Sequence, residues 1–551
     1  MSDVFKDNAR IFWGPLFNGR FSPANTTHLE AMDSELVILR EMMNRALRLR
    51  NELTWSCKLP SEVRILIVLF LRDDWPPRRR WARVEQQYKF QSGWMAVTHV
   101  CSHWRTLTLE APILWAAHPD LKGIAKQFIP TILAWSKTCP LDLQANVLEK
   151  EHLDLLLRWL GRLESHDVRR LHLGWDRSGY APFVELLTRV SPYLRGLQFL
   201  HLNIDCEDAF ELPKHISNVS SMTHLSLAGF HFPWDAPMFS HNLQHLSLET
   251  HRNPLRTRPK YSELQALLSN LRSLRTLELN GVIPLDISSE TIQLSETLQR
   301  FDYIGSHDRN LEALQFIARV RLPCSCTTKM ILYSSHDESS GVNPLVGACL
   351  AASSIFGSEG FCGPAELYYA PNHITVFAKE EGLRLRKTPR VFPSGGLQSH
   401  SSPGRDIRFI DLAHSMNFEN YLEFLPLSNL QAITIFNLQS NKILSLFDRL
   451  APCALRIRRA GIWLRECLPL VHALMDLADD GFALFPKLET LVLHSSPVDD
   501  MKLFIELTAL ETLVKLRKSE GSPLREIAVC QNTEGWGIWD AVKDDVQVTF
   551  L

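Results

Sequence analysis

Three residues whose side chains can bind metals or act as nucleophiles lie close together in the stretch VTHVCSHW. His99, Cys101 and His103 follow one another at intervals of two residues. Imidazole nitrogen and thiolate sulfur are common zinc ligands, and a cysteine with a histidine is also the pairing of a cysteine nucleophile. On a helix, however, His99 and His103 share one face while Cys101 points elsewhere, and no second cluster of suitable spacing supplies a fourth ligand. We therefore expect no metal site, and we expect Cys101 to be a small buried side chain of a packed helix.

The sequence gives no other indication of catalysis. A catalytic Cys101 would need a base and an oxyanion site, and no local signature marks either of them. Elsewhere the sequence lacks the GxxxxGK phosphate loop, a GxGxxG turn after a strand, HExxH and GxSxG. We therefore expect a protein that is not an enzyme, with no catalytic residue and no cofactor.

Composition and charge limit the classes of protein to which the chain can belong. Its 551 residues are 45% hydrophobic and 22% charged, which is typical of a soluble protein of two to four domains. The net charge of −2 argues against binding nucleic acid through a broad basic field. The N-terminus lacks the apolar run of a secretory signal, and no segment approaches the roughly 18 apolar residues of a membrane span. The eleven cysteines are scattered without a CxxC pair, so we expect reduced thiols and a location in the cytoplasm or the nucleus.

The first 55 residues divide into an irregular arm and a helix. Glycine and proline, Pro15 among them, interrupt residues 1–28, for which we expect no regular structure. Residues 29–55 lack both and are rich in helix formers, so they predict a helix. This helix either packs on the next domain or pairs with a second helix as a coiled coil, which would permit self-association through residues 29–53. Its heptad pattern, interrupted by one arginine, consists of Leu29, Leu36, Met43 and Arg50 in one row and Met32, Leu39, Ala46 and Leu53 in the other.

A nearly continuous apolar helix is expected after Leu59 and Pro60. Proline suits the first turn of a helix, and the acidic Glu62 suits its positive N-terminal end. The segment LPSEVRILIVLFL, residues 59–71, is apolar on most sides, which is typical of a helix buried both in its own domain and against something else. Residues 72–93 are polar and interrupted by prolines, and they predict a loop. Helical spacing returns in WMAVTHVCSHWRTL, where one stripe contains Val97, Val100, Cys101 and Trp104.

Residues 56–118 resemble the F-box, a family of small three-helix domains. The family pattern is Leu-Pro with an acidic residue two positions on, a hydrophobic helix, a Val-Cys-x-x-Trp helix and a closing Leu-Trp. This chain contains LPSEV, VCSHWRTL and PILW in that order, and the match covers about a tenth of its length. The form VCSHWRTLTLEAPILW is especially similar to F-box-like proteins of mushroom-forming fungi, which often carry a heptad helix just upstream. The connection at residues 72–93, which includes PPRRRW, is longer than usual, and it either lies on the surface or obstructs the adaptor interface.

The resemblance implies partners and residue roles. F-boxes dock on the small Skp-family adaptor of a cullin–RING ubiquitin ligase, and a downstream domain holds the protein substrate. By this resemblance the adaptor-binding residues are Leu59, Pro60, Val63, Ile67, Val68 and Leu71. The residues of the F-box core are Val100, Cys101, Trp104, Leu107 and Trp115.

An internal repeat follows in residues 119–551. A leucine before an alternating hydrophobic–x–hydrophobic core recurs eleven times, as in VRRLHLGW, LQFLHLNI, MTHLSLAG, LQHLSLET and LRTLELNG. Successive copies are 21–31 residues apart in the first seven, for example at Leu225, Leu246 and Leu277. This resembles an irregular leucine-rich repeat, in which each copy is one short strand. Stacked copies form a solenoid with a parallel sheet on its concave side.

Two stretches rich in glycine, serine and proline, residues 335–364 and 385–405, interrupt the repeat. We expect the repeat register to be poorest between residues 330 and 405. The fold class expected for the whole chain is α/β, with an N-terminal helix, a small three-helix F-box and an irregular leucine-rich-repeat solenoid with a parallel concave sheet.

Residues between the core leucines should line the concave surface, with which solenoids bind protein partners. Four of them in the first rows are histidines, and two interpretations are open: a pH-sensitive or metal-assisted ligand site, or a solvated strand face. The candidate substrate-binding residues are Arg170, His172, His201, His224, His245, Thr276, Glu278, Arg300 and Asp302.

The order of these modules leads to two hypotheses for function. In the first, the chain is the substrate receptor of an SCF-type ubiquitin ligase, with an adaptor and a cullin on one side and an unknown protein substrate on the other. In the second, it is a ligase-independent scaffold whose solenoid binds one partner and whose heptad helix binds another or self-associates.

Overall fold

The computed structural model describes most of the chain as a mixed α/β protein, as predicted. It divides into two compact units, residues 1–146 with 151–169, and residues 147–150 with 170–551. The described residues are 2–22, 29–82, 87–118, 121–148, 159, 167–175, 180–204, 210–250, 258–305, 309–323, 325–334, 351, 365–370, 373–377, 405–411, 422, 425, 427–435, 446, 450, 455–463, 468–479, 481–494 and 504–550.

Two long helices, α1 (Ser2–Arg20) and α2 (Leu29–Glu52), begin the chain. The helix predicted from residue 29 is confirmed. None of the residues of α2 is buried against the described part of the chain. The irregular arm predicted for residues 1–28 is wrong for residues 2–20. Pro15 lies inside α1, where it costs about 3 kcal/mol, but it removes only one backbone hydrogen bond and the other turns of this helix still form.

A small helical domain follows and packs around tryptophan side chains. Trp94 and Trp115 are buried with their ring centroids 4.9 Å apart, and the ring centroid of Trp135 lies 4.4 Å from that of Trp115. The domain consists of α3 (Trp55–Lys58), α4 (Ser61–Asp74), α5 (Ser102–Glu110), α6 (Pro112–Ala116) and α7 (Ile129–Ser136), with the 3-10 helices η1 (Gly93–His99), η2 (Leu121–Gly123) and η3 (Lys126–Phe128).

The connection between α4 and η1 is not the loop that the sequence predicted for residues 72–93. Helix α4 continues to Asp74, and β1 (Arg78–Ala82) pairs antiparallel with β2 (Gln87–Gln91). In QYKFQ the aromatic residues alternate with polar ones, which favours a strand with one apolar side. The neighbouring arginines make the segment polar as a whole, and for this reason it was predicted to be a loop.

The helix predicted through WMAVTHVCSHWRTL is also wrong at its centre. The 3-10 helix η1 and helix α5 are separated by Val100 and by Cys101, whose backbone is extended at φ −161° and ψ 170°. Helix η1 opens on Gly93, where φ is +55° and a Cβ would lie 2.5 Å from the carbonyl oxygen of Trp75. Because a 3-10 helix has three residues per turn, the predicted α-helical stripe from Val97 to Trp104 does not form.

The second unit contains the large parallel sheet that the repeat predicted. Eight strands from β5 to β18 pair in parallel, and Leu200, Leu225, Leu246 and Leu277 lie opposite one another in register. These eight strands are β5 (Val168–Trp175), β6 (Phe199–Ile204), β8 (His224–Ala228), β10 (His245–Glu249), β11 (Thr276–Asn280), β13 (Arg300–Ile304), β15 (Thr327–Ser334) and β18 (Arg405–Asp411). Two earlier strands, β3 (Ala117–His118) and β4 (Leu141–Leu148), pair in parallel within the first unit.

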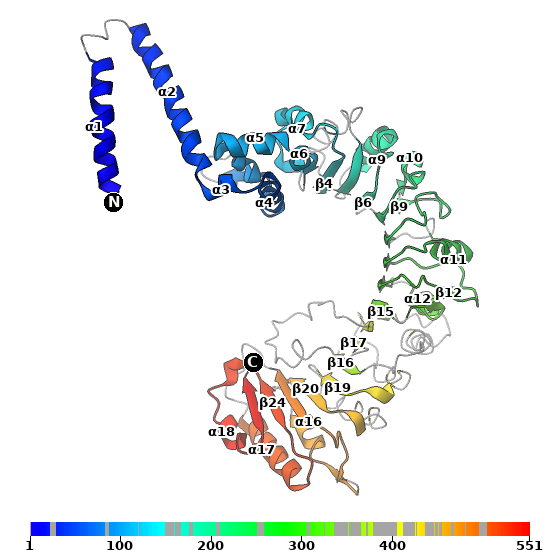
Figure 1. The fold of residues 1–551 in the computed structure, drawn as a ribbon. Helices are drawn as coiled ribbons and strands as arrows, with labels where there is room; N and C mark the ends of the chain where they lie inside the picture. Colours follow the sequence, from blue (N-terminus) through cyan, green and yellow to red (C-terminus); the bar gives the residue numbers. More distant parts are fainter. Residues whose placement is uncertain are drawn as a thin grey trace. The chain divides into compact units, whose positions relative to one another are not determined.

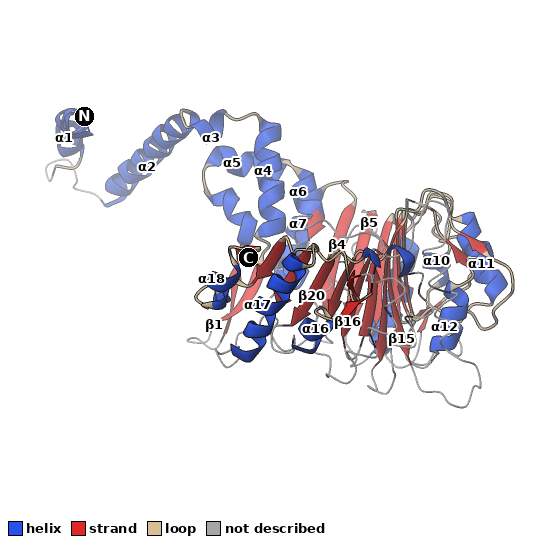
Figure 2. Ribbon diagram, turned by 90° about the horizontal axis from the view of Figure 1, so that it is seen from below, coloured by secondary structure: helices blue, strands red, loops and turns tan. Residues whose placement is uncertain are grey.

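Helices cover one face of this sheet (Figures 1 and 2). Leu246 and Leu248 of β10 are buried and alternate with the partly exposed Ser247, because successive side chains of a strand point to opposite faces. The core therefore lies between the sheet and its helices, and the other face carries the alternate residues. The covering elements are α9 (Tyr180–Val190), η6 (Ser191–Tyr193), α10 (Lys214–Ser217), α11 (Tyr261–Asn270) and α12 (Asn310–Ile317), with the short strands β7 (Phe210–Glu211), β9 (Phe230–His231), β12 (Ile292–Gln293) and β14 (Val320–Arg321).

A hairpin interrupts the parallel order after β15. Strand β16 (Glu366–Ala370) pairs antiparallel with β17 (His373–Phe377), and β17 pairs antiparallel with β18. Parallel pairing resumes from β16 to β19 (Ala432–Ile435) and onward. The interruptions predicted at residues 335–364 and 385–405 lie almost entirely outside the described residues. The last elements are η9 (Leu427–Asn429), β20 (Arg459–Trp463), α16 (Leu468–Ala473), β21 (Leu477–Ala478), β22 (Gly481–Phe482), β23 (Thr490–His494), α17 (Phe504–Ser519), β24 (Glu526–Val529), η13 (Gln531–Thr533), α18 (Ile538–Val542) and β25 (Gln547–Phe550).

Within the described ranges, no helix combines the length and the hydrophobicity that crossing a lipid bilayer requires.

Candidate functional site

Helix α4 exposes a continuous apolar face. Val63, Leu66, Ile67 and Phe70 are 39%, 53%, 37% and 74% exposed, and their spacing of three and four residues places them on one side of the helix. Apolar side chains gathered in this way are typical of a surface that binds another protein. We call these four residues the α4 face. Of the other predicted adaptor-binding residues, Pro60 is exposed, and Leu59 and Leu71 are half-buried.

One predicted adaptor-binding residue, Val68, is wrong as a surface contact because it is completely buried. When a helix is apolar on nearly all sides, the spacing of its apolar residues does not indicate which side is buried. Leu66 and Phe70 were missed for the same reason. Their positions three and seven residues after Val63 are the signal that could have found them.

The predicted core of the small domain is partly correct. Trp104 and Trp115 are buried, and Leu107 is half-buried. The indole Nε1–H of Trp115 donates to the carbonyl oxygen of Thr108 at 2.8 Å, which satisfies its single polar atom inside the core. Val100 is wrong as a core residue. It is exposed, because the chain leaves the 3-10 helix at this point.

The prediction that Cys101 is buried inside a packed helix is wrong, because Cys101 is half-buried and precedes α5 with an extended backbone. It lies beside a second cysteine. Both Cys101 and Cys57 are half-buried, and their Sγ atoms are 4.0 Å apart. His99 and His103 are exposed. Among the residues that the structure describes, no three His, Cys, Asp or Glu side chains come together in an arrangement that could hold a metal ion.

The parallel sheet places all nine candidate substrate-binding residues on its uncovered face, in two rows. Neighbouring strands are in register, and positions two apart on a strand share a face. The first row is Arg170, Phe199, His224, His245, Thr276 and Arg300. The second row is His172, His201, Ser226, Ser247, Glu278 and Asp302. Phe199 was not predicted, although its position immediately before a core leucine is the same as that of His224.

Aromatic and imidazole rings contact one another across the first strands of these rows. The ring centroids of His172 and His201 are 4.0 Å apart, and those of Phe199 and His224 are 4.2 Å apart. His245 stacks on His224 at 5.8 Å. We call these five residues the imidazole surface. It presents flat rings with a polar edge, which can take part in both apolar contacts and hydrogen bonds.

Charged side chains lie at both ends of the imidazole surface. At one end the guanidinium carbon of Arg170 lies 4.3 Å from the ring centroid of Phe199, a cation–π contact. At the other end Arg300 donates to both carboxylate oxygens of Asp302, with Nε–O distances of 3.1 and 3.0 Å. A ligand of this face would therefore meet an uncharged centre and charged ends.

Burial lowers the pKa of every histidine on the imidazole surface, because partial desolvation disfavours the imidazolium. The pKa of His201 falls to about 4, first through burial and then through repulsion by charge on His172 and His245. The pKa of His245 is lowered by burial although the nearby carboxylate of Glu278 opposes the shift. The surface is therefore uncharged at neutral pH.

Acidification should destabilise the second unit through these histidines. The unfolded chain binds protons below a histidine pKa of about 6.5, whereas folded His201 resists protonation until about pH 4. Stability is therefore fully present above pH 6.5 and is lost as the pH falls toward 4. After allowance for the partial exposure of the ring, we expect about 1–2 kcal/mol from His201.

Urea unfolding of wild type and His201→Gln between pH 7 and pH 4 measures this loss. The variant should lose less stability on acidification, and the exposed His215→Gln control should behave as wild type. Equal losses in wild type and His201→Gln would contradict the assignment.

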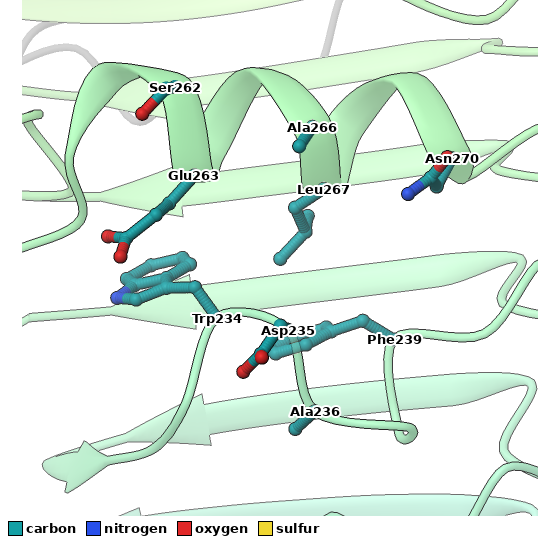
Figure 3. Close-up of a pocket in the computed structure, with 9 residues that line it drawn as sticks. All are labelled: Trp234, Asp235, Ala236, Phe239, Ser262, Glu263, Ala266, Leu267 and Asn270. Atoms are coloured by element: carbon teal, nitrogen blue, oxygen red, sulfur yellow. The ribbon is translucent and has the colours of Figure 1, made fainter.

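The covered face of the sheet carries a pocket of about 460 Å³ between the turn at residues 233–239 and helix α11 (Figure 3). Trp234, Phe239 and the carboxylates of Asp235 and Glu263 line it. The Glu263 carboxylate accepts a hydrogen bond from the backbone N–H of Lys260 at 2.8 Å, at the N-terminus of α11. One of the two carboxylates therefore stabilises the start of α11.

No protein-family model matches the chain, and no curated protein matches its sequence.

Proposed function

We propose that the chain is a substrate receptor of an SCF-type cullin–RING ubiquitin ligase. In this proposal residues 56–118 are an F-box that docks on a Skp-family adaptor and, through it, on a cullin. Residues 119–551 are an irregular leucine-rich-repeat solenoid that holds the target protein. The chain catalyses no reaction itself, and it acts in the cytoplasm or the nucleus, where such ligases work.

The observation that carries the proposal is the α4 face. It begins just after Leu59 and Pro60, where the resemblance to the F-box puts the adaptor. Its apolar side chains are exposed while Val68, on the other side of α4, is buried, so the helix has one side for its own domain and one for a partner. Trp104 and Trp115 support this division of roles, because they are buried where the family pattern needs a core.

The imidazole surface and its charged ends support the second half of the proposal. Rings that stack at 4.0–5.8 Å on hydrogen-bonded strands lose little conformational entropy when a partner binds. Aromatic side chains and arginine are also the residue types that most often dominate protein interfaces. We therefore assign target binding to the two rows of the uncovered sheet face.

Binding to a purified Skp-family adaptor tests the first half of the proposal. Ile67→Asp/Phe70→Asp should weaken binding at least 100-fold, because two carboxylates would be desolvated in an apolar interface. The matched control is Leu285→Asp, which also places an aspartate at an exposed apolar residue, but in the second unit. Titration calorimetry measures the affinities after circular dichroism has shown that all three proteins are folded.

Two results would contradict the ligase proposal: no binding by wild type, or equal binding by wild type and the α4 variant.

The alternative function is a ligase-independent scaffold. The exposed heptad residues Leu29, Leu36 and Met43 favour that alternative, because unpaired a/d positions are suited to a second helix. Light scattering distinguishes it, since self-association through residues 29–53 predicts a dimer in wild type and a monomer in Leu36→Glu/Met43→Glu.

A further inference from the structure

The first unit brings together two cysteines that are 44 residues apart in the sequence. Cys57 lies in the short helix α3, and Cys101 is the N-cap residue of α5. Their Sγ atoms are 4.0 Å apart, and both side chains are half-buried, so small molecules in solvent can reach them. Of the other described cysteines, Cys326 and Cys530 are buried.

The two sulfur atoms are 4.0 Å apart, within reach of a disulfide bond. A sulfur–sulfur bond is about 2.05 Å long, so the two sulfurs need to approach by about 2 Å. Rotation about the Cα–Cβ bond of a cysteine moves its sulfur by more than this distance. Neither residue is inside a long helix that would have to shift, since α3 has four residues and Cys101 is extended.

We propose that Cys57 and Cys101 are a redox-modification site that forms a reversible disulfide on exposure to hydrogen peroxide. The thiolate of one cysteine attacks a peroxide oxygen and breaks the O–O bond, which gives a sulfenic acid and, with a proton, one water. The second thiol then attacks that sulfur, the S–S bond forms, and the hydroxyl leaves as a second water. Two thiols are oxidised, one peroxide is reduced to two waters, and a dithiol reverses the product by exchange.

The disulfide would tie α3 to the start of α5 and close a loop that contains the whole of α4. It would therefore restrict the segment that connects α2 to the small domain, and it would stabilise that domain against unfolding. This inference stands apart from the proposed ligase role, because it concerns only the thiols and the elements that hold them.

Peptide mapping of the full chain tests the proposal directly. Cleavage after lysine and arginine releases Cys57 in residues 51–58 and Cys101 in residues 90–105, and each peptide contains a single cysteine. After treatment with hydrogen peroxide and blocking of free thiols, the two peptides should be recovered joined, with a loss of two hydrogens, and separate again after dithiothreitol. The same treatment in urea should reduce the yield of the joined peptides at least tenfold, because only the folded protein holds Cys57 and Cys101 close together.

Variants provide the control. Cys57→Ser should leave Cys101 without this cross-link, and Cys139→Ser, at another half-buried cysteine, should leave the yield unchanged. The oxidised wild type should melt about 5 °C or more above the reduced protein, and Cys57→Ser should not show this rise. Recovery of both peptides unjoined, or joining of Cys101 to other cysteines in comparable yield, would overturn the proposal.

Discussion

Replacing Arg459 with methionine should lower the free energy of unfolding of the second unit by about 3–5 kcal/mol. Arg459 of β20 reaches across β19 to the carboxylate of Glu366 in β16, with Nη2 and Oε1 3.1 Å apart. The two side chains are only 4% and 0% exposed. Without the guanidinium, the sheet would hold a buried carboxylate that has lost its compensating cation, and desolvation of that charge is the source of the cost.

A double variant separates this charge effect from packing. Glu366→Leu/Arg459→Met removes both charges and should recover most of the stability lost in Arg459→Met, because an apolar pair of similar volume has no desolvation cost. Urea unfolding of wild type, the two single variants and the double variant completes the cycle. If the double variant is as unstable as the sum of the single ones, the pair contributes through shape alone and the prediction is wrong.

Trp115→Ala should be equally damaging, but in the first unit, with an expected cost of about 3–5 kcal/mol. The buried indole contacts the rings of Trp94 and Trp135, and its removal leaves a cavity that neighbouring rings cannot fill without losing their own contacts. The carbonyl of Thr108 would also lose its indole donor.

The control for this prediction is Trp55→Ala, at a tryptophan that is exposed on α3. That change should alter stability by less than about 0.5 kcal/mol. Denaturant unfolding followed by far-UV circular dichroism compares the three proteins. The result also bears on the proposed function, because a core tryptophan should reduce adaptor binding only by unfolding the domain, whereas the α4 variant should reduce it in a folded protein.

The sequence predicted the parallel sheet well because its signal is local and repeated. In MTHLSLAG and LQHLSLET the alternation marks the buried leucines and, between them, the exposed positions of His224 and His245. Since every strand uses the same register, a residue's place relative to its core leucine is enough to assign its row. The ring contact between His172 and His201 could not be predicted, because it depends on the separation and rotation of neighbouring strands.

Strand β20 shows why other parts of the sheet were missed. Its sequence RAGIW contains Gly461, which weakens a strand prediction. In the structure a Cβ at this position would lie 2.9 Å from Oγ1 of Thr434 and 3.1 Å from Nε2 of His494. The glycine therefore makes room for side chains of other strands, a requirement that no local pattern reveals.

The small domain was predictable in its motifs and less so in its geometry. VCSHW predicted a tryptophan core, and Trp104 is buried. LPSEV begins the helix that was predicted to bind a partner, and on that helix Ile67 is exposed but Val68 is buried. The 3-10 helix that replaces the predicted α-helix begins at Gly93, where the backbone lies against the carbonyl group of Trp75, and this contact is distant in the sequence. For that reason the proximity of Cys57 and Cys101 was not predicted either.

The order in which the strands pair has a consequence for synthesis on the ribosome. Strand β15 ends at Ser334, but β18, its next neighbour in the sheet, begins at Arg405, after residues 335–404 have been translated. At 5–20 residues per second this takes roughly 4–14 s. An uncovered strand edge is a template for pairing with other chains. Nascent chains that end between residues 335 and 404 expose the edge of β15, and we expect them to need a chaperone.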